Sequence, residues 1–219
     1  MTPTSHTTPA RIAVLASGGG SNLQSLLDYF ASHGNDAGSV VWVGSNRADA
    51  GALDRARAVG VEASVVTDHR DGDALLSQLM AARADLLVLA GYLKLVPSNV
   101  VRAFHGRLIN VHPALLPAFG GEGMYGMRVH EAVIALGARL SGVTVHFVDD
   151  AYDRGAIIAQ WPVRVFADDT PAALAARVLH AEHQLLPRTV AAVAAGLVSL
   201  GENGRVFGEV PLPAFTTIS

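Results

Sequence analysis

The sequence predicts an α/β fold, with a doubly wound, mostly parallel sheet of Rossmann-like topology and an antiparallel hairpin on its C-terminal side. Two features predict this fold. Short, nearly all-apolar runs alternate with segments whose apolar residues recur at helical spacing, a pattern typical of parallel strands buried between helices on both faces. After residue 140, two strand-like runs flank a single turn, which indicates a hairpin that extends the sheet.

The first half of the chain contains the alternating elements. RIAVLA at 11–16 is expected to form a buried strand that leads into a glycine-rich loop. Leu23, Leu26 and Phe30 then recur at helical spacing, and Gly60 ends the second helical pattern. The expected strands are 11–16, 40–45, 62–67, 85–91 and 107–111, and the expected helices are 23–33, 50–60, 71–84 and a short segment near 97–104.

The second half contains the hairpin and a long helix. The hairpin is built from an alternating strand (SGVTVHFVD, 141–149), a turn (AYDRG, 151–155) and a second strand (AIIAQWPVRVF, 156–166). A long helix is expected at about 171–195, with Pro171 in its first turn and Thr170 as its N-cap. The segment 197–219 is expected to add a small β element.

The composition indicates a globular protein. The chain has 219 residues and a net charge of −3, and no apolar run reaches the roughly 18–20 residues that a membrane-spanning helix needs. We expect a single domain at 11–200, a disordered lead-in at 1–10 and a tail at 201–219. The absence of cysteine fits a cytoplasmic protein, and the scattered basic residues argue against a nucleic-acid surface. No membrane partner is expected either.

A glycine-rich loop, SGGGSN at 17–22, joins the first strand to the first helix. Its backbone N–H groups and the helix dipole make a site for an anion, and three glycines leave the backbone open to a phosphate. Ser21 and Asn22 add side-chain donors and are candidates to cap the helix. Neither a dinucleotide fingerprint nor a P-loop is present, so a small phosphorylated ligand is favoured. The alternative is a tight turn that needs glycine for positive φ.

Asn110 and His112, in GRLINVHPALLP, stand at alternate positions near the carboxyl end of an expected strand, so their side chains project from the same side. They could form a satisfied structural pair. GVTVHFVDDAYDRG, however, places Asp149, Asp150 and Asp153 in a turn after another strand. A carboxylate from this turn is expected to raise the pKa of His112 and orient its ring. With the Asn amide as donor to a developing oxyanion, these groups would form a site for acyl transfer without a covalent intermediate.

The nucleophile of such a reaction is expected to come from a substrate. The sequence has no thiol, and no G-x-S-x-G elbow occurs in it. His180 and His183 flank Glu182 on the last expected helix, but H-E-x-x-H is absent. We interpret this cluster as a solvated helix face, and no metal site is expected.

Several motifs, in order, resemble those of the glycinamide ribonucleotide formyltransferase family, the folate-dependent enzymes of purine synthesis. The similarity runs from Arg11 to about Ala195. It rests on IAVLASGGGSNLQSLLD, SNRADAGALDRARAVGV, LLVLAGYLKLVP, GRLINVHPALLP, GVTVHFVDDAYDRGAIIAQ and ARVLHAEHQLLP. NVHPALLP followed by VTVHFVDDAYDRG is specific to formyl transfer from folate, and SGGGSN narrows the acceptor to a phosphorylated ribose.

The resemblance implies that 10-formyltetrahydrofolate is the co-substrate, that glycinamide ribonucleotide is the acceptor, and that no metal is needed. It implies catalytic roles for Asn110, His112 and Asp153, and a supporting role for His146, whose alternative is a core histidine. The implied binding residues are Gly20, Ser21, Asn22 and Glu182 for the ribonucleotide, and Leu93, Lys94, Leu95, Val96, Asp149 and Asp150 for the pterin. The oligomeric state, including a homodimer, is left open.

Two features depart from the family pattern. Leu179 stands where relatives often have Lys or Gln near the phosphate. FGGEGMYGMRVH at 119–130 is longer and richer in glycine than the corresponding loop of many relatives. This loop either shapes the substrate mouth or forms a flexible lid, and His130 within it could reach the site.

Three related enzymes and one non-catalytic class are the alternatives. The chain length disfavours a methionyl-tRNA formyltransferase, which would need a C-terminal RNA-binding domain. It also disfavours a formyltetrahydrofolate hydrolase, which would normally carry an N-terminal regulatory domain. The glycine loop disfavours a sugar-nucleotide formyltransferase. An anion-binding module on the same fold would keep SGGGSN without needing the three candidate catalytic residues.

Overall fold

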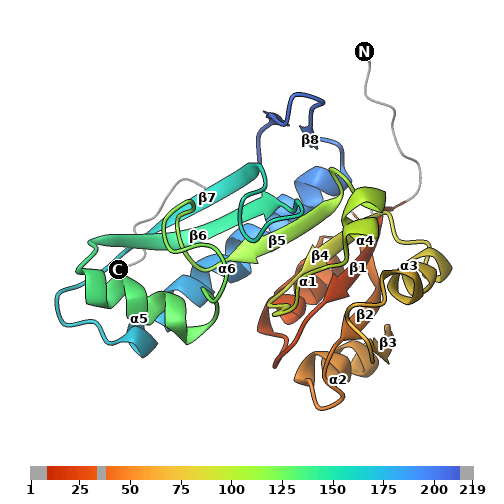
Figure 1. Ribbon diagram of the computed structural model, residues 1–219, viewed down its shortest axis with the longest axis horizontal. Helices are drawn as coiled ribbons and strands as arrows, with labels where there is room; N and C mark the ends of the chain where they lie inside the picture. The colour runs from red at the N-terminus through yellow and green to blue at the C-terminus, as the bar shows by residue number, and fades with distance from the viewer. Residues whose placement is uncertain (1–8, 34–37, 213–219) are drawn as a thin grey trace.

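A seven-stranded sheet with the order β3-β2-β1-β4-β5-β6-β7 lies at the centre of the molecule (Figure 1). This computed structural model describes residues 9–33 and 38–212, so most of the expected lead-in and the end of the expected tail lie outside the described residues. The strands are β1 (Arg11–Leu15), β2 (Ser39–Ser45), β3 (Glu62–Val65), β4 (Leu86–Leu89), β5 (Leu108–His112), β6 (Leu140–Phe147) and β7 (Ile157–Arg164).

Helices follow the strands in the alternation that the sequence predicts. They are α1 (Ser21–Ser32), α2 (Gly51–Ala58), α3 (Gly72–Ala81), α4 (Ser98–Ala103), α5 (Met127–Leu136) and α6 (Pro171–Ala194). A separate antiparallel pair, β8 (Val198–Leu200) and β9 (Val206–Gly208), follows α6, which confirms the expected small β element. No helix in the described part of the chain is long and apolar enough to cross a membrane.

The strand directions confirm the predicted sheet. The first five strands pair in parallel, β6 is antiparallel to β5, and β7 is antiparallel to β6. The strand order reverses at β1, because β2 lies on one side of it and β4 on the other. In doubly wound sheets, ligands bind beyond the carboxyl ends of the strands at such a reversal. The glycine-rich loop leaves β1 at this point.

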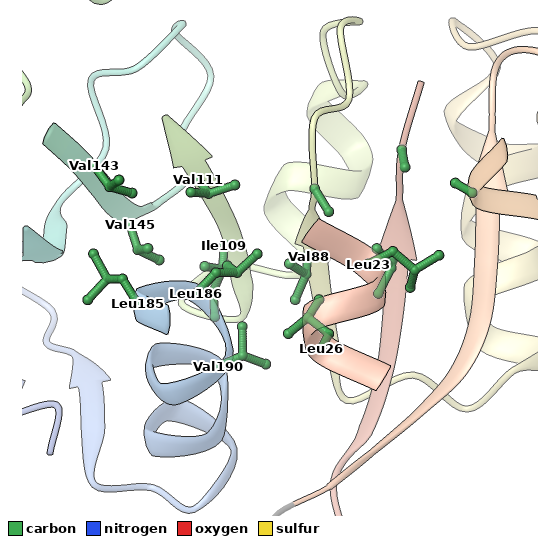
Figure 2. Packing of buried hydrophobic residues seen from close by; sticks show 14 of the residues in the cluster. Leu23, Leu26, Val88, Ile109, Val111, Val143, Val145, Leu185, Leu186 and Val190 are labelled. Carbon is green, nitrogen blue, oxygen red and sulfur yellow. The ribbon is translucent and has the colours of Figure 1, made fainter. Parts of the chain in front are cut away.

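Alternate residues of the central strands β1, β4 and β5 enter two different cores. Ile109 and Val111 of β5 face one core, whereas Leu108 faces the other. Figure 2 shows the first core, in which Leu23 and Leu26 of α1 and Leu185, Leu186 and Val190 of α6 pack near Val88, Ile109, Val111, Val143 and Val145. The second core lies on the opposite face and includes residues of α3 and α4. Both faces of the sheet are therefore buried, as its apolar strands require.

The long helix α6 begins as the sequence predicts. The side chain of Thr170 accepts a hydrogen bond from the amide of Ala173, and Pro171 occupies the first helical position. From there α6 contacts β5, β6 and β7 as well as α1 and α5. It thereby connects the two halves of the sheet and brings its central residues to the carboxyl end of β5.

Two expectations about helices are wrong. Helix α1 begins at Ser21 rather than 23, its N-cap is Gly20, and no side chain caps it, because Ser21 and Asn22 already lie in its first turn. Helix α5 was not expected at all, and the last four residues of the 119–130 loop belong to it or to its first turn. Its helical signal was weak: Val129 and Val133 are buried one turn apart, but Gly126 and the preceding glycines dominate the sequence pattern.

Candidate active site

A cavity of about 670 Å³ opens at the carboxyl ends of β4 and β5. Its wall comes from segments far apart in the sequence: the start of α1, the segment after β4, the end of β5, the loop before α5, the turn after β6 and the middle of α6. A volume in this range is typical of a site for a small organic ligand. The residues expected to be catalytic, Asn110, His112 and Asp153, all line this cavity.

Asn110 and His112 lie on one side of β5, as their alternate spacing predicts. In the antiparallel register of the next strand, Asn110 lies opposite His146 and His112 lies opposite Thr144. Thr144 donates to the carbonyl of Ala114 at 2.7 Å and accepts from the amide of Leu116 at 3.0 Å. This buried hydroxyl therefore fastens the segment that follows His112 to β6.

The carboxylate of Asp153 joins the site residues. Its Oδ2 lies 3.5 Å from Nδ1 of His112, and its Oδ1 accepts from Nδ2 of Asn110 at 3.5 Å. Nδ2 of Asn110 also lies 3.1 Å from Nε2 of His146, which is 3.7 Å from Oδ1 of Asp153. Residues separated by about forty positions in the chain thus share one small volume.

The loop before α5 holds this cluster through its backbone. The amide of Gly121 donates to Oδ2 of Asp153 at 2.9 Å, and Nε2 of His112 lies 2.8 Å from the carbonyl oxygen of Phe119. Because a carbonyl only accepts, Nε2 carries the proton in this contact. Gly120 lies between them, and a Cβ there would meet the side chain of Leu116 at 2.4 Å and that of Asp153 at 3.2 Å. The roles of these three loop residues are not predictable from the sequence, because a backbone contact depends little on residue type.

The pKa of His112 is lowered rather than raised, so the expectation from the sequence is wrong in direction. Burial is the main cause and outweighs the charge of Asp153 and the hydrogen bond to Phe119, while His146 adds to the lowering. Burial would also raise the pKa of Asp153, but its contacts with the neighbouring His146 and His112 and with the amide of Gly121 hold it below its usual range. The resting site therefore pairs an ionised carboxylate with a neutral imidazole.

His146 is both a core residue and a neighbour of the cluster. It is 2% exposed, its Nδ1 lies 2.7 Å from the carbonyl oxygen of Phe147, and its Nε2 faces Asn110. Because Nδ1 is directed at a carbonyl, it carries the proton, and Nε2 accepts from the Asn110 amide. The two interpretations of His146 offered by the sequence are therefore compatible.

Asn22 and Glu182 form a buried pair in the wall of the same cavity. Nδ2 of Asn22 donates to Oε2 of Glu182 at 2.5 Å, and each side chain is 8% exposed. Burial raises the pKa of Glu182 to about 7, an effect that the hydrogen bond from Asn22 only partly offsets. This carboxyl group is thus divided between its protonated and ionised forms near neutral pH.

Gly20 and Ser21, which are also expected to bind the ribonucleotide, do not line the main cavity. Gly20 has φ +75°, and a Cβ there would lie 2.7 Å from Cα of Ala52, so its glycine is needed for the turn and for close packing on α2. A Cβ at Gly18 or Gly19 would meet no atom within 4 Å, so the space around both positions is open. Ser21 lines a neighbouring surface groove rather than the main cavity.

The segment after β4 supplies another part of the wall. Leu93, Lys94, Leu95 and Val96 all line the cavity, as does Asp149, whereas Asp150 is exposed and does not. Ser17 fixes this segment beside the glycine loop, because its hydroxyl accepts from the amide of Leu93 at 2.9 Å and donates to Asn46 at 2.6 Å. The two expected binding segments are therefore tied to each other.

Three residues of the wall carry a buried polar atom without a hydrogen-bond partner among the described residues. They are Asn22 (Oδ1), Tyr92 (the hydroxyl) and His130 (Nδ1). Burial raises the pKa of Tyr92 to about 12, and burial together with the nearby His112 lowers the pKa of His130. Tyr92 was not anticipated as a site residue. Unsatisfied groups of this kind are typical of a wall that contacts a ligand or an ordered water.

The histidines near Glu182 do not join it in one cluster. His180 is exposed and contacts Gln184 at 2.9 Å, whereas Glu182 faces the cavity and His183 faces the groove. Among the residues that the structure describes, no group of three or more His, Cys, Asp or Glu side chains could hold a metal ion. Leu179 lies in the cavity wall, so this position contributes an apolar side chain and no charge.

Comparison with known proteins gives consistent matches over most of the chain. The family profile described as formyl transferase matches residues 10–190. The chloroplastic phosphoribosylglycinamide formyltransferase of Arabidopsis thaliana is 44% identical over 201 residues, which cover 89% of this chain and 68% of that protein. The protein of the same name from Vigna unguiculata is 45% identical over 189 residues, which cover 84% of this chain and 60% of that protein.

A solved structure superimposes on this chain over almost its whole length. The phosphoribosylglycinamide formyltransferase from Anaplasma phagocytophilum superimposes with a TM-score of 0.86 at 33% sequence identity. The superposition covers 96% of this chain and 99% of that chain. The sheet order and the additional hairpin described above thus belong to an architecture that is already known from experiment.

The buried carboxyl of Glu182 predicts a specific dependence of stability on pH. In the folded chain it stays protonated up to about pH 7, whereas in the unfolded chain it ionises near 4.5. Its contribution is fully present below pH 4.5 and is lost as the pH rises through about 7. Relative to wild type, Glu182→Gln should therefore gain on the order of 2–3 kcal/mol in unfolding free energy between pH 5 and pH 8.

Urea unfolding at the two pH values measures this gain. Glu131→Gln is the matched control, because Glu131 is an exposed glutamate of α5 and its replacement removes the same charge. The control should show no such change with pH. An equal difference between Glu182→Gln and wild type at both pH values would contradict the proposed burial effect.

Proposed function

The chain belongs to the formyl transferase family, and we propose that it transfers the formyl group of 10-formyltetrahydrofolate to the amine of glycinamide ribonucleotide, in purine biosynthesis. The observation that carries the proposal is the convergence of Asn110, His112 and Asp153 on one cavity that the Asn22–Glu182 pair also lines. An acyl-transfer site needs an oxyanion donor and a proton acceptor beside the ligand, and this cavity has candidates for both.

The reaction needs no nucleophile from the protein. The amine nitrogen of the ribonucleotide attacks the formyl carbon, a C–N bond forms, and the carbonyl electron pair moves onto oxygen. Collapse of this tetrahedral intermediate breaks the bond between the formyl carbon and the folate nitrogen. The amine nitrogen loses one proton, and the departing folate nitrogen gains one.

Asn110 donates to the oxygen on which negative charge develops, and His112 adds to this stabilisation once it takes up a second proton, because its resting proton faces the carbonyl of Phe119. The Nδ2 group of Asn110 carries two protons, and its contact with Asp153 at 3.5 Å is at the limit of a hydrogen bond. One proton can therefore bond to His146 while the other turns to the formyl oxygen. His112 is neutral at rest, so it does not repel the positive charge that develops on the amine nitrogen as the C–N bond forms.

Asp153 assists the transfer of the proton. Its carboxylate lies beside Nδ1 of His112, and its pKa is held below the usual range. It can accept the amine proton through an ordered water and return it to the departing nitrogen, while the backbone amide of Gly121 keeps it in place. The role is that of a shuttle, with no net change in the protonation of the enzyme.

Different segments around the cavity bind the two substrates. The glycine loop, Asn22 and Glu182 serve the phosphate, sugar and glycinamide of the ribonucleotide. The segment 93–96 and Asp149 serve the pterin, largely through backbone groups. Asp150 is exposed, so its proposed part is confined to shaping the turn.

Other expectations from the sequence stay predictions. They are the single domain at 11–200, the cytoplasmic location, the homodimer and the absence of nucleic-acid and membrane partners. The plant relatives are named as chloroplastic, so the location of this chain has to be measured in its own cell.

A spectrophotometric assay for folate product, with and without glycinamide ribonucleotide, tests the proposed function. We expect product only when the ribonucleotide is present. Product in its absence would indicate a formyltetrahydrofolate hydrolase instead. No product under either condition would favour an anion-binding module that keeps the glycine loop without catalysis.

Removal of the oxyanion donor or of the proton acceptor should slow turnover strongly. We expect Asn110→Ala and Asp153→Asn each to lower kcat by about 10²–10³ or more, because one oxyanion donor is worth about that factor. Both variants should keep the far-UV circular dichroism spectrum of wild type. Turnover near the wild-type value in either variant would remove the role proposed for that residue.

Gly120→Ala tests the backbone contacts of the loop. The added methyl group would meet Leu116 at 2.4 Å and push against Asp153, so the contacts of Phe119 and Gly121 with the cluster must shift. A misplacement of about 1 Å at a reacting group can cost roughly 10²-fold in rate, so kcat should fall by at least ~10-fold. Gly123→Ala, in the same loop, meets open space around its Cβ position but strains a backbone with φ +84°, so it shows the effect of backbone strain without crowding. Wild-type activity in Gly120→Ala would show that crowding at Asp153 does not matter.

A further inference from the structure

Arg55 of α2 bonds to the glycine-rich loop. Its Nε donates to the carbonyl oxygen of Gly19 at 2.7 Å, and its Nη1 donates to Oε1 of Gln24 at 3.0 Å. Within the described residues, it is the positively charged side chain that hydrogen-bonds to this loop. Its other terminal nitrogen has no hydrogen-bond partner in the described part of the chain. The arginine thus connects α2, the loop and the first turn of α1.

The contacts with α2 set the direction of the loop amides. The carbonyl of Gly18 accepts from the amide of Ala52 at 3.1 Å, and the carbonyl of Gly19 accepts from Arg55. In a trans peptide the C=O and the following N–H point in opposite directions. The amides of Gly19 and Gly20 therefore point away from α2, and neither bonds to any atom of the described residues.

Open space and free donors are present beside the loop. The positions of Gly18 and Gly19 are open, and the carbonyl of Gly20 accepts from the amide of Gln24, so α1 begins directly after the loop. The first amides of a helix lack partners within the helix and favour an anion. Asn22, in the same turn, is 8% exposed and lines the main cavity with Oδ1 unpartnered, which independently indicates a ligand beside the loop.

Positive charge near this loop comes from α2 rather than α6. Leu179 supplies no charge from α6. Arg55 lies in a groove of about 500 Å³ together with Ser21 and His183, and burial lowers the pKa of His183, which keeps that ring neutral. The guanidinium of Arg55 stays charged at all physiological pH values and suits a phosphate better than any neutral donor.

We propose that Arg55 is a positioning residue for the phosphate of the acceptor substrate: it fixes the Gly19–Gly20 peptide with its N–H toward the anion and adds positive charge beside it. The inference deepens the proposed function, because it takes the phosphorylated acceptor from there. It assigns to α2 the charge that the apolar Leu179 does not provide.

Kinetics of Arg55→Ala test the proposal, with Arg57→Ala as the matched control. Arg57 lies on the same helix, is exposed and pairs with Asp54 instead of the loop. Loss of a charge-assisted hydrogen bond should raise KM for glycinamide ribonucleotide about 10-fold, while kcat and KM for the formyl folate stay within about twofold. Arg55→Lys should recover part of the loss, because it keeps the charge. A KM unchanged in Arg55→Ala, or parallel changes in all three constants, would overturn the proposal.

A phosphate titration separates this inference from the proposed function. Inorganic phosphate is added to ¹⁵N-labelled protein, and the amide resonances of Gly19 and Gly20 are followed by NMR. We expect saturable shifts in wild type and Arg57→Ala, with at least several-fold weaker binding in Arg55→Ala. This outcome would support the inference even without formyl transfer. Equal binding in all three proteins, or no shift in wild type, would overturn it even if the enzyme is active.

Discussion

The geometry of the candidate site depends on one carboxylate that several donors share. Asp153 faces His112 with one oxygen and Asn110 with the other, and Gly121 adds a backbone donor. Its backbone adopts φ +55°, a left-handed conformation that is uncommon outside glycine and costs free energy. In this conformation the side chain accepts hydrogen bonds from both Asn110 and Gly121. A turn on a different element thus contacts Asn110, the proposed oxyanion donor of β5.

The sheet explains why these groups can meet. An antiparallel register places β6 directly beside the carboxyl end of β5, so Asn110 is opposite His146 and the turn that follows β6 folds back over His112. The carboxyl end of β6 itself lies beside the start of β5, because Phe147 pairs with Ile109 and the amide of Val148 donates to the carbonyl of Leu108. The acidic turn after β6 therefore folds back along β5 to bring Asp153 to Asn110 and His112, near the strand end where doubly wound sheets bind their ligands.

Sequence reasoning recovered the elements with strong periodicity and the side chains with distinctive chemistry. Alternation at Asn110 and His112 predicted a shared face, and that face is observed. The features that could not be predicted depend on backbone contacts and on the burial of side chains. The contact of Phe119 with His112 is made by a carbonyl, which any residue type can supply. The pKa of His112 follows from a balance between burial and a nearby charge, and the sequence shows the charge but not the burial. Helix α5 was hidden because its short apolar repeat follows a glycine-rich run.

The charges of the resting cavity favour an amine that is ready to attack. A protonated amine has no lone pair, so a site rich in ionised carboxylates would stabilise the unreactive form. Here Asp153 is ionised, but Asn110 and Gly121 already donate to it, and Glu182, with a pKa of about 7, is partly protonated near neutral pH. The neutral His112 adds no charge of its own. The cavity therefore does little to stabilise an ammonium group, whereas the free N–H groups at the glycine loop lie where the phosphate is proposed to bind. Binding energy comes from one end of the acceptor, and its other end is left neutral for the chemical step.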